Sequence, residues 1–202
     1  MPRAGLDRSR VLMAAAVIAD GEGLAAVSFA RLAAVLGVRA PSLYNHVESL
    51  GALLDGLAVM AAEELFDRAR AAIMARSGRE ALLALAHSHR DYAREHPGLY
   101  EASLRSLHRG DAAAAALGDR HMAVYLLVLD SMGHGGEAAL HLLRALRAAI
   151  GGFVEIERRG GFGLALDIDE SFVRMLALLL AGIQAIADRT LAAQVTPIAS
   201  PE

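Results

Sequence analysis

Apolar residues recur every three to four positions along almost the whole chain, which is the spacing of one face of an α-helix. Alternation of apolar and polar residues with a period of two, which marks a half-buried strand, is hard to find. Clusters of Gly and Pro divide the pattern into segments. The pattern predicts an all-α protein of about nine helices, over residues 9–20, 28–36, 40–47, 51–76, 79–95, 99–108, 111–131, 137–157 and 170–191, with an interruption at Gly151 and Gly152.

The stretch "SFARLAAVLGVRAPSLYNHV" contains two of these helices, separated by a short turn. Ser28, like Ser9 before the first helix, is of a residue type that caps helix N-termini. Gly37 suits the left-handed position that ends a helix. Pro41 stands in the first turn of the next helix, where its missing N–H is tolerated. This spacing predicts a helix-turn-helix.

The second helix of this motif has one apolar and one polar face. Leu43 and Val47 are four residues apart, so both can anchor the helix to the core. In a helix-turn-helix the outward side chains of the second helix contact base edges and phosphates in the major groove. Hydroxyl, amide and imidazole groups suit those partners. The outward residues are Arg39, Ala40, Pro41, Ser42, Tyr44, Asn45 and His46.

Composition narrows the class of protein. The chain of 202 residues is 55% hydrophobic but only 4% aromatic, so its core must consist mainly of Ala, Leu, Val and Ile. The absence of Cys excludes disulfides, thiolate metal sites and a Cys nucleophile. The longest apolar run, Met175–Ile183, is too short to span a bilayer. Because the N-terminus lacks an apolar signal-peptide segment, we expect a cytoplasmic protein with no membrane partner.

Charge gives little sign of a polyanionic partner. The net charge is −3, and all 20 basic residues are Arg, whose planar guanidinium suits phosphate. Within residues 1–55 five acidic residues balance five arginines. Any binding to DNA is therefore expected to be modest and to depend strongly on salt. The five arginines are Arg3, Arg8, Arg10, Arg31 and Arg39.

The segment "SFARLAAVLGVRAPSLYNHVESLGALLDGL" resembles the N-terminal domain of the TetR family of transcriptional regulators. The resemblance covers about residues 6–65, and its Leu-Gly-Val and Leu-Tyr-x-His-Val elements are specific. It implies a three-helix DNA-binding head at residues 1–50, a ligand-binding and dimerisation domain at 51–195, and a flexible tail at 196–202. The DNA-binding residues that we predict are Ser28, Arg31, Arg39, Ala40, Pro41, Ser42, Tyr44, Asn45 and His46.

One departure from the family pattern concerns the start of the fourth helix. The family usually carries a Lys there for a phosphate, whereas this chain has Leu50, with Glu48 nearby. Ala30 also stands where some members have an Arg that reaches a base. We therefore expect this head to hold the DNA backbone less firmly than its relatives.

The C-terminal half carries a weaker resemblance, to the ligand-binding domain of a TetR subgroup named for a Trp-His-Gly motif. The naming residues are largely absent, since Ile150, Gly151 and Gly152 occupy their place. The resemblance implies dimerisation through the last two long helices. An apolar stripe on the last helix fits that role, although it fits an internal core face equally well: Phe172, Leu176, Leu179, Ile183 and Ile186.

A ligand cavity is predicted in the domain formed by residues 51–195. Small-molecule sites are mostly apolar and carry a few polar groups, and such groups stand among the aliphatic helices. The candidates are His89, Tyr92, His96, Tyr100, Met122, Tyr125 and Met132. The resulting hypothesis is a homodimeric, ligand-responsive repressor that binds a palindromic operator and is released by a small-molecule effector. No enzymatic activity, cofactor or metal is expected.

Two alternatives stay open. One is a helical metalloenzyme that uses some of the eight histidines. His87 and His89 are poorly placed to chelate a metal together, because residues two apart point away from each other on a helix. The other is a dimer with the TetR fold that has lost strong DNA binding, which the balanced charge of the head and Leu50 would allow.

Overall fold

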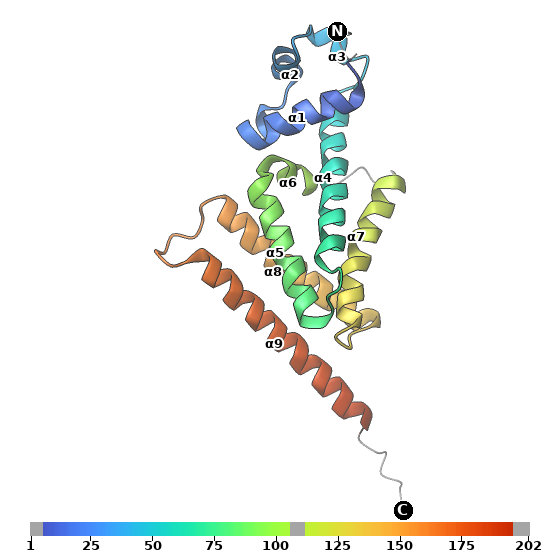
Figure 1. Ribbon diagram of the computed structural model, residues 1–202, viewed down its shortest axis with the longest axis vertical. Helices are drawn as coiled ribbons and strands as arrows, with labels where there is room; N and C mark the ends of the chain where they lie inside the picture. The colour runs from blue at the N-terminus through green and yellow to red at the C-terminus, as the bar shows by residue number, and fades with distance from the viewer. Residues whose placement is uncertain (1–5, 106–111, 196–202) are drawn as a thin grey trace, which may run out of the picture. The chain divides into compact units, whose positions relative to one another are not determined.

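The computed structural model describes residues 6–105 and 112–195, and the regular structure in this part of the chain is helical throughout (Figure 1). The predicted all-α class is confirmed. Arg3, the first residue of the helix predicted over 111–131 and the predicted tail 196–202 lie outside the described residues. The elements are α1 (Arg8–Glu22), the short 3-10 helix η1 (Leu24–Ala26), α2 (Phe29–Leu36), α3 (Ala40–Leu43), α4 (Leu50–Ala72), α5 (Gly78–Glu95), α6 (Pro97–Ser103), α7 (Ala112–Asp130), α8 (Gly136–Arg158) and α9 (Ile168–Val195).

The chain forms two compact units. The first contains the residues up to Arg68 together with Asp91–His121, and the second contains Ala69–Arg90 together with the residues from Met122 onward. Helices α4, α5 and α7 therefore each run from one unit into the other. The sequence pattern separated a head from the rest at residue 50, whereas the contacts group that head with most of α4 and with α6.

In the first unit, α1 supplies much of the core of the head. Val11, Ala15 and Ile18, which are three or four residues apart and so share one face of the helix, are buried. The helix begins one residue before Ser9, and its cap is Asp7, whose carboxylate accepts the backbone N–H of Arg10 at 2.8 Å. A carboxylate in this position also complements the positive end of the helix dipole.

Helix α2 begins and ends where the sequence predicted. The Ser28 hydroxyl oxygen accepts the N–H of Arg31 at 3.2 Å, and Gly37 adopts the left-handed conformation with φ of 66°. Helix α3 is shorter than predicted, because it ends at Leu43 rather than Val47. The N–H groups of His46 and Val47 both bond to the carbonyl of Leu43, so the chain tightens into a turn there.

Helix α6 lies directly against the C-terminal end of α1. It begins at Pro97, two residues before the predicted start, and Pro is tolerated at that first position. A Cβ atom on Gly98 would lie 2.1 Å from the carbonyl carbon and oxygen of Ala19, so only glycine permits this approach.

In the second unit, α8 continues without interruption through Gly151 and Gly152, contrary to the prediction of a break. Helix α9 begins two residues before the predicted start. Its first turn is capped by Asp167, whose carboxylate accepts the N–H groups of Asp169 and Glu170 at 2.7 and 3.1 Å.

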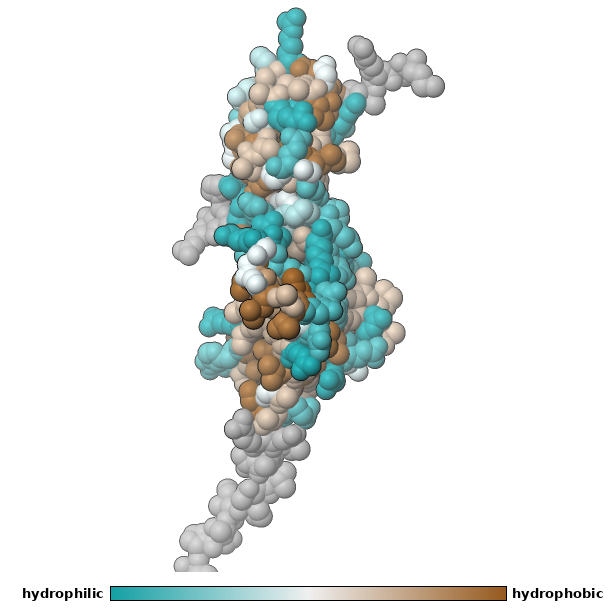
Figure 2. Space-filling model, turned by 90° about the vertical axis from the view of Figure 1, so that its left-hand side faces the viewer, coloured by the Kyte–Doolittle hydropathy of each residue, from teal (hydrophilic) through white to brown (hydrophobic). Residues whose placement is uncertain are grey.

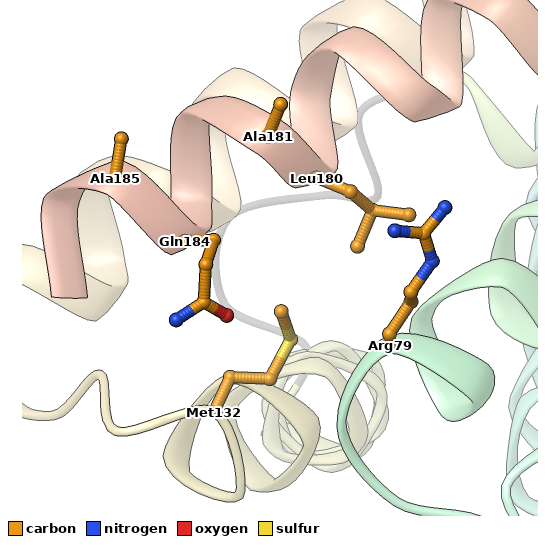
Figure 3. A pocket seen from close by; sticks show the side chains of 6 residues that line it. All are labelled: Arg79, Met132, Leu180, Ala181, Gln184 and Ala185. Atoms are coloured by element: carbon orange, nitrogen blue, oxygen red, sulfur yellow. The ribbon is translucent and has the colours of Figure 1, made fainter. Parts of the chain in front are cut away.

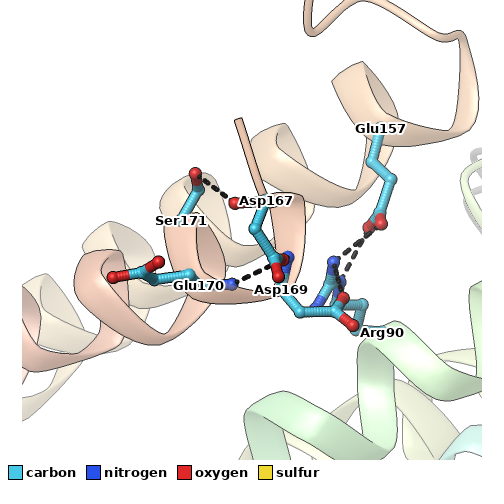
Figure 4. A network of polar contacts seen from close by, with 6 residues as sticks. All are labelled: Arg90, Glu157, Asp167, Asp169, Glu170 and Ser171. Atoms are coloured by element: carbon cyan, nitrogen blue, oxygen red, sulfur yellow. Dashed lines mark hydrogen bonds and ion pairs between the residues drawn. The ribbon is translucent and has the colours of Figure 1, made fainter. Parts of the chain in front are cut away.

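A buried cation joins three elements of this unit (Figure 4). Arg90 of α5 is 3% exposed and bonds through Nε and Nη2 to both carboxylate oxygens of Glu157, each at 2.7 Å. Its Nη2 also lies 2.8 Å from a carboxylate oxygen of Asp169 at the start of α9. The guanidinium stacks over the ring of Phe172 at 4.5 Å. Because two carboxylates pair with this guanidinium, its charge can be buried.

Candidate functional site

The segment from Arg39 to Val47 presents a polar surface held on an apolar base. Leu43 and Val47 are buried, so the predicted anchors of this segment lie in the core of the head. Arg39, Pro41 and Asn45 are exposed, and Ala40, Ser42 and His46 are half-buried. The predicted DNA-reading residues of this segment are therefore all at least partly accessible.

Tyr44 combines exposure with a fixed position. It is 56% exposed, and its ring lies 4.6 Å from the ring of Phe29, centroid to centroid. A tilted aromatic contact of this kind limits the rotation of an otherwise free side chain. The phenol can thus be presented to a groove with little loss of conformational entropy on binding.

Two further predicted residues lie at the N-terminus of α2. Ser28 uses its oxygen to cap the helix, which leaves its hydroxyl hydrogen to donate to a phosphate. Arg31 is engaged differently: Nε and Nη2 bond to the carboxylate of Glu22 at 2.7 to 3.1 Å. The hydrogen bond with Arg31 lowers the pKa of Glu22, and the same bond raises the pKa of Arg31.

The start of α4 lacks the cation that the family pattern carries. Leu50 is partly exposed at the first position of the helix, and Ser49 accepts the N–H of Ala52 at 3.0 Å as a cap. Glu48 is exposed beside it. This side of the head therefore offers a carboxylate and an aliphatic group where a phosphate contact would need a donor.

Some of the predicted ligand residues belong to a polar cluster in the first unit. The buried hydroxyl of Tyr92 donates to the carboxylate of Glu64 at 3.0 Å, and burial together with that carboxylate raises the pKa of Tyr92 strongly. The guanidinium of Arg68 lies over the same ring and pairs with Glu95. The Tyr92 ring also contacts the ring of His96 at 5.2 Å.

His96 in turn bonds to the end of α1. Its Nδ1 lies 2.8 Å from one carboxylate oxygen of Asp20, while the other oxygen accepts the N–H groups of Gly98 and Leu99, each at 2.9 Å. Residue 96 itself gives α6 no side-chain cap. Asp20 therefore caps α6 from a different helix, which makes it the residue that fastens α6 to α1.

A pocket of about 330 Å³ lies in the second unit (Figure 3). Leu180 and Gln184 project from α9 toward Arg79 of α5 and Met132, which follows α7. Ala181 and Ala185 complete its lining. Met132 is thus the one predicted ligand residue on the wall of this pocket. Tyr100 and Tyr125 are buried, and His89 and Met122 are half-buried, so their predicted role in ligand binding stays a prediction.

The predicted stripe on α9 faces the interior of its own unit. Phe172, Leu176 and Ile183 are buried, Leu179 is half-buried and Ile186 is 37% exposed. The stripe is therefore a core face, the second of the two roles that its spacing allowed. A neighbouring face of α9 is apolar and exposed instead; it consists of Val173, Ala177, Leu178, Ala181, Gly182 and Ala185.

Further apolar surface lies on the connection between α8 and α9. Figure 2 faces this connection and shows brown, hydrophobic surface at the middle of the view. Leu164 and Leu166 of the connection are among the most exposed large apolar residues of the described chain. Contiguous apolar patches on a protein surface often mark interaction sites.

The described residues contain no group of three or more His, Asp or Glu side chains placed to hold a metal ion. In the same part of the chain no helix is long and apolar enough to cross a membrane.

Sequence reasoning missed three residues of this arrangement. The sequence pattern assigns Asp20 and Glu22 no role beyond their charge, and it assigns Gly98 no role. A signal was present in the first two, because a carboxylate in the last turn of a helix opposes the helix dipole and needs a partner. The identity of each partner could not be read from sequence spacing, since one lies nine residues away and the other more than seventy.

Comparison with known proteins gives consistent results. Residues 82–179 match the model of the family described as "Tetracyclin repressor-like, C-terminal domain". The chain is 37% identical to the uncharacterized HTH-type transcriptional regulator YobS of Bacillus subtilis, over 90% of this chain and 95% of that protein. It is 32% identical to the uncharacterized HTH-type transcriptional regulator Rv0681 of Mycobacterium tuberculosis, over 90% of this chain and 83% of the relative.

Solved structures show the same fold. A TetR variant from Acinetobacter baumannii, crystallised with minocycline, superimposes with a TM-score of 0.67 at 23% identity, over 91% of this chain and 99% of that one. These relatives are regulators of transcription rather than enzymes, so the metalloenzyme alternative has no support from them. With a helix-turn-helix at one end and a tetracycline-repressor-like domain at the other, the chain belongs to the TetR family of transcriptional regulators.

Proposed function

We propose that this regulator is a repressor that binds a palindromic operator as a homodimer and is released by a small-molecule effector. The observation that carries the proposal is the segment 39–47. Leu43 and Val47 are buried beneath it while Arg39, Tyr44 and Asn45 stay exposed. An apolar anchor with an accessible polar face is what a helix needs in order to enter a major groove.

Homodimerisation is proposed because a palindrome presents two half-sites to two recognition helices. The exposed apolar face of α9, from Val173 to Ala185, is the proposed interface. Its small residues allow two helices to approach closely. Leu178 is 76% exposed, and a two-fold symmetric contact would bury this side chain on both protomers.

The effector is proposed to bind in the second unit. The pocket combines the guanidinium of Arg79 with the aliphatic Leu180 and the thioether of Met132, so it suits an apolar molecule that carries an anionic group. Helix α4 starts in the head and ends in the second unit. A ligand that favours one position of that helix end would alter DNA affinity, provided that it binds the two states with different affinity.

The DNA-binding proposal is tested by fluorescence anisotropy with the DNA upstream of the protein's own gene, cut into overlapping duplexes, at several salt concentrations. Arg39→Ala and Tyr44→Ala should each weaken binding by at least about fivefold, since one base contact contributes roughly 1–3 kcal/mol. Arg144→Ala is the matched control, because Arg144 is exposed on α8 and outside the head.

Two results would overturn this proposal: no duplex bound even at low salt, or Arg39→Ala and Tyr44→Ala binding as tightly as the wild type. The first result would favour the alternative of a TetR-fold protein that has lost DNA binding.

The dimer is tested separately by sedimentation equilibrium. Leu178→Asp should raise the dimer dissociation constant at least ~100-fold, because burying one leucine side chain contributes roughly 1.5–3 kcal/mol and each dimer contains two. Leu127→Asp is the control, since Leu127 is similarly exposed but lies on α7. An unchanged dissociation constant for Leu178→Asp would exclude this face as the interface.

The effector proposal is tested by thermal shift with a panel of medium-chain alkyl carboxylates, since a ligand of the folded state raises the unfolding temperature. Arg79→Gln should remove the shift. A shift of equal size in Arg79→Gln would rule out this pocket as the site of the anion.

A further inference from the structure

Glu22 and Arg31 form a two-pronged ion pair on the surface of the head. Nε of Arg31 lies 3.1 and 3.0 Å from the two carboxylate oxygens of Glu22, and Nη2 lies 2.7 Å from one of them. The side chains are 42% and 45% exposed, so the pair is open to solvent and to any ligand of the head.

Glu22 occupies a position that the helix itself disfavours. It is the last residue of α1, where the helix dipole is negative and a cation would be stabilising. The neighbouring acid, Asp20, is fully engaged with the N-terminus of α6. The Glu22 carboxylate pairs with Arg31. An exposed pair of this kind contributes little net stability, so it can be exchanged for a better partner.

Arg31 occupies a position that suits DNA. It stands in the first turn of α2, next to the cap Ser28, where the helix dipole is positive and attracts phosphate. The described part of the head, residues 6–50, contains four arginines: Arg8, Arg10, Arg31 and Arg39. An interaction that occupies Arg31 therefore removes a large share of the cations available for the DNA backbone.

We propose that Glu22 competes with a DNA phosphate for the guanidinium of Arg31 and thereby limits the affinity of this regulator for DNA. The carboxylate of Glu22 and a DNA phosphate are equivalent partners in this respect, because the planar guanidinium can donate two parallel hydrogen bonds to either group. The carboxylate of Glu22 occupies the hydrogen-bond donors Nε and Nη2 of Arg31 and thereby withholds them from the DNA backbone. This inference rests on the proposed DNA-binding function.

A purely structural role makes a different prediction. If the pair only ties α1 to α2, its removal should slightly lower the unfolding temperature and should leave DNA affinity unchanged or lower. If Glu22 restrains Arg31, removal of the Glu22 carboxylate should strengthen DNA binding and add a phosphate contact through Arg31. An added contact makes the fall of log K with log salt steeper by about 0.9 for each head. That slope does not respond to a change in stability.

The test compares the wild type with Glu22→Gln in anisotropy titrations between about 0.05 and 0.3 M salt. At ~0.1 M salt the variant should bind up to about eightfold more tightly for each head, which is the gain that one phosphate contact makes at a slope of 0.9. Glu48→Gln is the control for the removal of a negative charge, since Glu48 is exposed on the same head. Glu48→Gln should leave the salt slope close to that of the wild type.

A double-mutant cycle decides whether Arg31 carries the effect. In an Arg31→Gln background, Glu22→Gln should change the DNA affinity and the salt slope no more than Glu48→Gln does. An equal gain with and without Arg31 would overturn the inference, and so would an unchanged salt slope in Glu22→Gln.

The two proposals fail in different ways. If the wild type binds DNA and Glu22→Gln binds equally well, this inference fails while the proposed function stands. If neither protein binds any duplex at low salt, the proposed function fails and this inference with it. If only Glu22→Gln binds, the inference is supported directly.

Discussion

Replacing Asp20 by Ala should detach α6 from α1. The carboxylate accepts three hydrogen bonds, from Nδ1 of His96 and from the N–H groups of Gly98 and Leu99, and the two N–H donors belong to the unsatisfied first turn of α6. Alanine leaves these donors without their acceptor in a partly buried place.

The expected loss follows from these three bonds. A hydrogen bond to a charged group contributes roughly 1.5–3 kcal/mol, but bonds that share one carboxylate are not additive. Loss of a helix cap alone is worth roughly 0.5–2 kcal/mol. We therefore expect Asp20→Ala to lower stability by about 2–4 kcal/mol. For a protein of about 200 residues this corresponds to a fall in Tm of roughly 4–16 °C.

Thermal unfolding followed by circular dichroism measures the loss, and amide hydrogen exchange locates it. The amides of residues 98 and 99 should exchange faster in Asp20→Ala than in the wild type, whereas those of α9 should not. Asp20→Asn, which keeps an acceptor for both amides, should lose about half as much. Asp119→Ala is the control, because Asp119 is exposed on α7. A fall in Tm below about 2 °C with unchanged exchange at residues 98 and 99 would refute the reasoning.

Three further predictions follow from contacts within single units. Gly98→Ala should destabilise the protein by about 3 kcal/mol, because the new Cβ would overlap the backbone of α1. Gly118→Ala has open space around the new Cβ and should stabilise the protein by roughly 0.5–1 kcal/mol. Denaturant midpoints measure both changes. Arg90→Met should lower the free energy of unfolding by about 3–5 kcal/mol, because it leaves the largely buried carboxylate of Glu157 without its cation. Arg174→Met, which breaks an exposed ion pair, should lower it by less than about 1 kcal/mol, and equal losses in the two variants would contradict this reasoning. Because the folded state raises the pKa of Tyr92, its contribution to stability is complete below pH 10 and is lost as pH rises further; Tyr92→Phe should therefore show a shallower loss of stability above about pH 10.

Much of the fold could be predicted because its signals are local. Ser28 and Gly37 bound α2 in the structure as in the sequence, since capping depends on hydrogen bonds within a few residues. Leu43 and Val47 are buried because a short amphipathic segment has one apolar face to bury. Errors at the ends of elements have local reasons too: Tyr44 to His46 continue the helical pattern of residue types, but their hydrogen bonds form a turn.

The candidate site was less predictable, because its residues meet through tertiary contacts. The spacing of the stripe on α9 showed that one face of the helix is apolar, yet it could not say whether that face packs within the chain or against another. Likewise the aromatic and histidine side chains chosen as ligand residues are polar groups within helices, and Tyr92 and His96 have found carboxylate partners from other helices.

The amino-acid sequence by itself determined the all-α class, the helix-turn-helix and the polar surface that it presents, because helix periodicity, capping and anchor spacing are properties of neighbouring residues. Only the tertiary structure decided what the charged residues do. Asp20 caps a helix more than seventy residues away, Arg90 is neutralised by two carboxylates from other elements, and Arg31 is held by Glu22. The physical reason is that an ion pair depends on distances across the packed chain, which no periodicity encodes.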